Sequence, residues 1–131
     1  MMRKAINSSR IKAHKNPIPH ASSLRGLVIS SSISGSDIEG KYSSDKEEQI
    51  RKAFENMKFV LNEANASFDD VIKFDLYFSD KNDRKFVNPI WLKLFPDETS
   101  RPARHSHLIH LDGDCVFQIV FIAVKSETNH E

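Results

Sequence analysis

Arg104 is the residue whose chemistry is most readily assigned to a ligand. It begins an alternating stretch, residues 104–111, which is followed by an apolar stretch at 115–124. A guanidinium carries a permanent charge and a planar set of donors that matches a carboxylate at two points. Because the alternation predicts a strand, we expect Arg104 to present its charge at one end of a sheet, to a small carboxylated molecule. A structural ion pair is the alternative use of such an arginine.

His105 and His107 follow directly and, being two residues apart on a strand, point to the same face. A His-x-His pair can ligate a metal, but no third ligand has a clear spacing, so we expect no metal site. One of them could instead act as an acid or base in a cleft, and an inert interface histidine is the alternative. His20 is a second candidate of this kind.

The composition excludes several classes of protein. With 131 residues, 39% hydrophobic residues and a formal net charge of +1, the chain fits one soluble domain without a basic field for nucleic acid. The longest apolar stretch is too short to span a membrane. The lone Cys115 excludes an internal disulfide, fits a reducing compartment and is expected to be a small buried hydrophobe. Trp91 and Phe95 are expected in the core rather than as a platform for bases.

Two helices are expected. Ser44 and Glu47 have the spacing of a capping box, and the apolar residues over 50–64 recur three and four apart on one face. Asn65 follows where a left-handed residue can close the helix.

The second helix is expected within residues 80–95. Pro89 conflicts with a continuous helix because it lacks the N–H donor and clashes with the preceding turn. We therefore expect Asn88 to cap a helix in which Pro89 is the first residue.

Strands are expected at residues 4–7, 24–33, 71–79, 104–111 and 115–124. Within 71–79 one face carries Ile72, Phe74, Leu76 and Phe78, and the other carries Val71, Lys73, Asp75 and Tyr77.

The first 36 residues contain no acidic residue, which is typical of an organellar transit peptide. No apolar face repeats there at helical spacing, and Pro17 and Pro19 break any helix early. A short strand at 4–7 is therefore preferred, with a cytoplasmic location expected and mitochondrial targeting as the alternative. Residues 126–131 are expected to be a flexible tail.

The expected order is strand, strand, helix, strand, helix, strand, strand. Strands joined through a long helix form parallel crossovers, so the pattern predicts an α+β fold with a mixed sheet and both helices on one face. The other face, with Tyr77 and the histidines, would be solvated or buried between subunits, and we favour an oligomer.

At this point the chain resembles a known family. The stretches that carry the resemblance are 49–58, 64–67, 69–73, 77–80, Val87-Asn88, Phe95-Pro96, Arg101-Pro102-Ala103-Arg104 and Ile122-Ala123-Val124. In order and spacing they are similar to the YjgF/RidA family, also called the L-PSP family. The resemblance runs from about residue 3 to residue 124.

The resemblance implies a chorismate-mutase-like fold and a homotrimer with ligand sites between subunits. It also implies hydrolysis of small imine or enamine acids to 2-keto acids and ammonia, without a metal or cofactor. Arg104 matches the arginine that pairs with the substrate carboxylate, Ser30 matches a serine of the site, and Asn88 matches an asparagine next to it.

The chain departs from the family at four positions. Gln118 stands where deaminating members have a glutamate, and an amide can orient water but cannot accept its proton as a carboxylate does. Ile18 replaces a tyrosine, Ser31 replaces a glycine and Ser106 replaces a common cysteine.

Three functional hypotheses follow from the sequence. The first is an imine or enamine deaminase with Arg104 as the carboxylate anchor and Gln118, His105 or His107 beside the reacting carbon. The second is a non-catalytic or regulatory trimer that binds a 2-keto acid. The third, and least favoured, is an endoribonuclease or translation inhibitor, because the basic and aromatic residues do not interleave as RNA binding requires.

Overall fold

The structure is a computed structural model in which residues 2–125 are described. The tail predicted at 126–131 lies outside this range. The strands are β1 (Lys4–Ile6), β2 (Ala21–Leu24), β3 (Leu27–Ser30), β4 (Ile33–Ser34), β5 (Val71–Phe78), β6 (Ala103–Leu108) and β7 (Phe117–Val124). The helices are α1 (Lys46–Glu63) and α2 (Arg84–Leu94), with short 3₁₀ helices η1 (Phe68–Asp70), η2 (Lys81–Asp83) and η3 (Glu98–Ser100).

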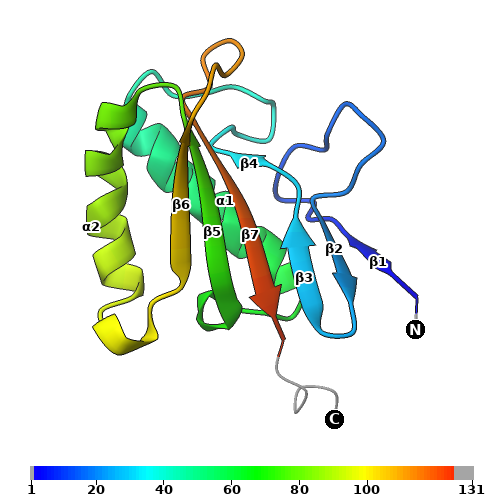
Figure 1. Ribbon diagram of the computed structural model, residues 1–131. Helices are drawn as coiled ribbons and strands as arrows, with labels where there is room; N and C mark the ends of the chain where they lie inside the picture. The colour runs from blue at the N-terminus through cyan, green and yellow to red at the C-terminus, as the bar shows by residue number, and fades with distance from the viewer. Residues whose placement is uncertain (1, 126–131) are drawn as a thin grey trace.

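The strands form one mixed sheet in the order β1-β2-β3-β7-β5-β6, with β4 also paired to β7. β5 and β6 are parallel and are connected through α2, whereas the other pairs are antiparallel. Figure 1 shows α1 crossing behind β5 and β7, with α2 alongside β6. The predicted mixed sheet with two helices on one face is confirmed. Within residues 2–125, none of the helices combines the length and apolarity needed to cross a bilayer.

The core lies between α1 and the central strand β7. Phe117, Ile119, Phe121 and Ala123 alternate along β7 and are each 0% exposed, which places them all on the face that α1 covers. Phe54 of α1 stacks on Phe117 with ring centroids 6.0 Å apart. The predicted apolar face over residues 50–64 is therefore the face that packs on the sheet.

The strand predicted at residues 24–33 is wrong as a single element. It is split into a hairpin of β2 and β3, followed by the short β4. Arg25 and Gly26 have φ values of 53° and 84°, and two such residues form the tight turn whose twist matches paired strands. The β2 strand, rich in serine, has no strong strand signal in the sequence.

Both predicted helix starts need correction. Asp45, not Ser44, caps α1, because its side chain accepts a hydrogen bond from the Glu47 amide. The second helix begins at Arg84 and contains Pro89 in its interior, so Asn88 is not a cap. Pro89 and Lys85 are both exposed, and water can therefore satisfy the Lys85 carbonyl that has lost its partner. Asn65 closes α1 as predicted, with φ of 58°.

One position of β5 also differs from the expected alternation. Val71 is buried, whereas Ile72 is 55% exposed. The register with β7 shifts between Val71 and Lys73, and this bulge exchanges the faces of the first two residues. From Lys73 onward the predicted alternation holds.

Gln49 ties the start of α1 to two loops. Its side chain is buried, donates to the carbonyls of Ser43 and Asp114, and accepts from the Val116 amide at 2.7 Å. All the hydrogen-bonding capacity of the amide nitrogen is thus used. The residue holds the loop before α1 against the segment that enters β7.

Replacing Gln49 with alanine should lower the free energy of unfolding by about 3 kcal/mol, because a buried N–H and two carbonyls lose their partner. Urea denaturation measures the change. Asn62→Ala, which removes an exposed amide from the same helix, is the matched control and should change stability by less than about 0.5 kcal/mol. Equal effects of the two substitutions would contradict this role of Gln49.

Candidate substrate-binding site

The two faces of the edge strand β6 carry different functional groups. Arg104 and Ser106 lie opposite Phe74 and Leu76 of β5, which are buried beneath the helices. His105 and His107 lie opposite Asp75 and Tyr77, on the face that no helix covers. The prediction that the two histidines share a face is confirmed, and Arg104 points to the other side of the sheet.

Arg104 is half-buried and lies over the ring of Trp91, with its guanidinium carbon 5.0 Å from the ring centroid. Burial, and to a smaller extent the charge of Arg84, lowers the pKa of Arg104. A guanidinium keeps its proton under these conditions. None of the ion pairs among residues 2–125 includes Arg104. Its charge is therefore available to an anion, and the alternative of a structural ion pair finds no support in this part of the chain.

A stripe of α2 faces Arg104. Arg84, Asn88 and Trp91 are four and three residues apart and hence follow one side of the helix. Asn88 is exposed. The contribution of Arg84 was missed from the sequence, although its spacing to Asn88 and Trp91 is the signal that could have found it.

A pocket of about 190 Å³ opens at the end of β6. Its lining includes Ser106 from the strand and Lys81 and Arg84 from the start of the helical segment, together with His107 at the strand edge. Two cationic side chains and a hydroxyl are suited to a small anion. Phe78 and Leu108 supply an apolar part of its lining, and Arg104 is not among its described lining residues.

On the uncovered face, Asp75, Tyr77, His105 and His107 form a compact group. Nε2 of His107 donates to Oδ1 of Asp75 at 2.9 Å, and the His107 ring stacks on Tyr77 at 4.5 Å with an angle of 13° between planes. The hydrogen bond from His107, helped by the charge of Lys73, lowers the pKa of Asp75. The sequence placed Asp75 and Tyr77 on this face without assigning them any role.

Gln118 lies on β7 opposite Tyr77 and Ser34. It is half-buried between the fully buried Phe117 and Ile119, so the alternation puts its amide on the uncovered face. Gln118 and Arg104 of one chain therefore lie on opposite faces of the sheet.

The other predicted site residues lie at the far side of the sheet from β6. The Ser30 hydroxyl accepts from the Phe121 amide at 2.9 Å, and the Ser31 hydroxyl donates to the Pro19 carbonyl at 2.8 Å. Ile18 is 48% exposed in the adjoining loop. Since β3 is separated from β6 by β7 and β5, one chain does not bring these residues to Arg104.

His20 has a structural role. It is 4% exposed, and its Nδ1 accepts from the Ser8 amide at 3.1 Å. That contact fixes the ring proton on Nε2, which donates to the Lys12 carbonyl at 2.9 Å. With both ring nitrogens engaged, His20 holds the loop over residues 8–20 and is not free for acid or base chemistry.

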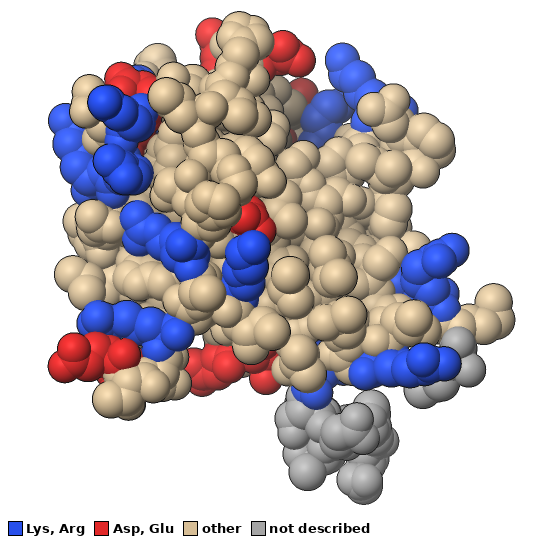
Figure 2. Space-filling model, viewed as in Figure 1, with Lys and Arg blue, Asp and Glu red and all other residues tan. Residues whose placement is uncertain are grey.

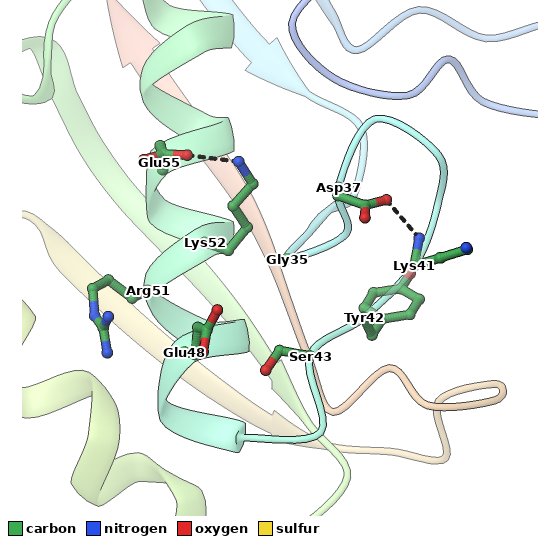
Figure 3. A pocket seen from close by; sticks show the side chains of 9 residues that line it. All are labelled: Gly35, Asp37, Lys41, Tyr42, Ser43, Glu48, Arg51, Lys52 and Glu55. Atoms are coloured by element: carbon green, nitrogen blue, oxygen red, sulfur yellow. Dashed lines mark hydrogen bonds and ion pairs between the residues drawn. The ribbon is translucent and has the colours of Figure 1, made fainter.

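A larger hollow of about 630 Å³ lies between α1 and the loop that precedes it, as Figure 3 shows. Charges of both signs line it, among them Asp37, Glu48 and Arg51. None of the predicted site residues is part of its described lining. Cys115, Trp91 and Phe95 are buried, as predicted.

The fold and the arginine on the edge strand define an α+β protein of the L-PSP type. The family model described as Endoribonuclease L-PSP matches residues 9–124, and the chain belongs to this family.

Known relatives agree with this assignment. TdcF of Escherichia coli is 27% identical over 128 residues, which cover 95% of this chain and 99% of TdcF. A solved structure of TdcF with bound serine superimposes with a TM-score of 0.84 at 26% identity, covering 94% of this chain and 99% of that one. Reactive Intermediate Deaminase A, chloroplastic, of Arabidopsis thaliana is 28% identical over 109 residues, 82% of this chain and 57% of the relative.

A RutC family protein of Pyrococcus abyssi is 35% identical over 82 residues. The match covers 62% of this chain and 63% of that relative, so this chain spans less than two thirds of its length.

Proposed function

We propose that this chain is a homotrimeric hydrolase that converts small 2-imino or enamine acids to 2-keto acids and ammonia, with Arg104 binding the substrate carboxylate. The net reaction adds one water at the imine carbon, breaks the carbon–nitrogen bond and releases ammonia. The observation that carries the proposal is Arg104 itself, a half-buried cation without an ion pair among the described residues.

The surroundings of Arg104 suit a carboxylate. The guanidinium lies over the Trp91 ring, and a guanidinium can form two parallel hydrogen bonds to a carboxylate. Arg84 adds a second positive charge nearby. Holding the substrate by its carboxylate fixes the position of the neighbouring imine carbon for attack by water.

The relatives support a small carboxylated ligand. TdcF has been solved with bound serine, in which the carboxylate and the amino group are attached to the same carbon. The Arabidopsis relative is named as a reactive intermediate deaminase. An imino acid has the same arrangement of carboxylate and nitrogen, and we carry this ligand class over to the Arg104 site.

The uncovered face of the sheet supports association into a trimer. Leu24, Leu27, Ile29 and Val124 are 38–45% exposed. Leu27 is paired with Leu24 of β2 and with Val124 of β7, and Ile29, two residues along β3, is paired with Ile122 of β7. Figure 2 views this face and shows a broad area without Lys, Arg, Asp or Glu, with charged groups gathered toward its rim. An apolar area of this kind marks a surface for another subunit.

A second subunit would also complete the site. Arg104 and Gln118 of one chain face opposite sides of the sheet, so a substrate on Arg104 cannot reach Gln118 of the same chain. In the proposed trimer Gln118 comes from the adjacent subunit, and its amide orients the attacking water. His107 remains a candidate for proton transfer on the same face as Gln118.

Arg104→Ala should lower kcat/KM by about 100-fold or more, because the substrate loses a charge-assisted pair of hydrogen bonds. The measurement is ammonia release from freshly generated 2-iminobutyrate. Arg51→Ala, which removes an arginine from the hollow in Figure 3, is the control and should leave the rate unchanged. If Arg51→Ala loses activity and Arg104→Ala does not, the substrate binds in that hollow and not at Arg104.

Ile29→Asp should convert the trimer to monomers, because it places an unpaired charge within the apolar face. Light scattering after size-exclusion chromatography measures the mass. Leu92→Asp on the outer side of α2, where Leu92 is 53% exposed, is the control and should remain trimeric. A monomeric wild-type protein, or a trimeric Ile29→Asp variant, would contradict the proposed assembly.

A non-catalytic sensor of 2-keto acids is the second candidate function, and Gln118 favours it because an amide cannot accept a proton from water. Gln118→Glu supplies a carboxylate and should raise the rate of ammonia release by about 100-fold. Wild-type protein that binds 2-ketobutyrate in calorimetry but releases no ammonia would identify the sensor and reject the hydrolase.

A further inference from the structure

The uncovered face carries three potential metal ligands that come from two strands. Asp75 is on β5, and His105 and His107 are on β6. One ligand atom from each lies within 4.8 Å of the other two. The sequence indicated no third ligand for the His-x-His pair. Asp75 is 30 residues from His105 in the chain and is brought beside the two histidines only by the parallel pairing of β5 and β6.

The distances are close to those of a zinc site. Oδ1 of Asp75 is 2.9 Å from Nε2 of His107 and 3.9 Å from Nδ1 of His105. Ligand atoms about 2.0–2.1 Å from a tetrahedral zinc ion are about 3.3 Å from one another. These two separations lie on either side of this value, so a small rotation of the His105 ring would bring the group closer to tetrahedral geometry.

The neighbours hold part of the site in place and leave part of it free. Tyr77 stacks on His107, which restricts rotation of that ring. The His105 side chain is 65% exposed and can turn toward an ion without disturbing the core. Two imidazoles with one carboxylate suit zinc and the other late first-row divalent metals better than magnesium or calcium.

The positive charge of Lys73 opposes a cation at this group. Its Nζ lies 3.6 Å from Oδ2 of Asp75, and its side chain is 42% exposed. Lys73 pairs with Oδ2 of Asp75, whereas His107 contacts Oδ1, and the exposed lysine side chain can move away into solvent. Its charge should weaken metal binding without preventing it.

We propose that Asp75, His105 and His107 bind a divalent transition metal of the zinc class, with one coordination position left open. The site is on the opposite face of β6 from Arg104, and zinc binding to it can be measured without any assay of imine hydrolysis. A bound ion would occupy both imidazoles and remove His107 as a free acid or base.

Zinc titration of the metal-free full-length protein by calorimetry tests the proposal, with Co²⁺ absorption as a readout of tetrahedral coordination. We expect one ion per chain. His105→Ala and His107→Ala should each weaken zinc binding by more than about tenfold. Mutation of residues that only orient the metal ligands already costs about that much affinity. Lys73→Met should strengthen it, because it removes a nearby positive charge.

The matched control is His110→Ala. His110 is 90% exposed, and its Nε2 lies 3.8 Å from Oδ1 of Asp112, so it offers the same chemistry without a third ligand. Binding of zinc should be unchanged in this variant. Absence of stoichiometric zinc binding in the wild type, or equal losses in His110→Ala and His107→Ala, would overturn the proposal. Circular dichroism of each variant separates loss of ligands from loss of fold.

Discussion

The alternation of side chains along β6 and β7 decides which functional groups of this chain can meet. On β6, Arg104 and Ser106 face the helices, whereas His105 and His107 face away from them. On β7 the same rule buries Phe117 and Ile119 and turns Gln118 to the uncovered side. A shift of one residue would exchange these sets. The chain therefore has two chemically distinct faces: Arg104 lies on one, and Gln118 and the proposed metal ligands lie on the other.

The register of these strands is fixed by the core and by buried amides. The phenylalanines of β7 pack beneath α1, and Gln49 accepts from the Val116 amide at the entry to this strand. Asn56, about two turns further along α1, donates to the carbonyls of Ser34 and Ser36 beside β4. These contacts fix β7 and β4 on α1, and the edge strand β6 is joined to them through its pairing with β5.

The sequence predicted the elements that have strong periodicity. The face of α1, the later residues of β5 and the parallel crossover through α2 could all be read from apolar spacing. The hairpin at Arg25-Gly26 and the continuation of α2 through Pro89 could not, because turn geometry and solvation of a free carbonyl decide them. For the candidate sites, the sequence predicted Arg104 as a carboxylate-binding residue from its place in an alternating stretch. Asp75 and Arg84 were missed as site residues because strand pairing and helix docking, not local sequence, bring them to their neighbours.

The claim that the hydrolytic site is shared between subunits is tested most directly by mixing two inactive variants. Arg104→Ala and Gln118→Ala are refolded separately and together, and ammonia release from 2-iminobutyrate is measured. If each site takes Arg104 from one subunit and Gln118 from the next, random mixing in equal amounts restores about a quarter of the sites. If both residues act from the same chain, the mixture stays as inactive as its components, and that result would contradict the account.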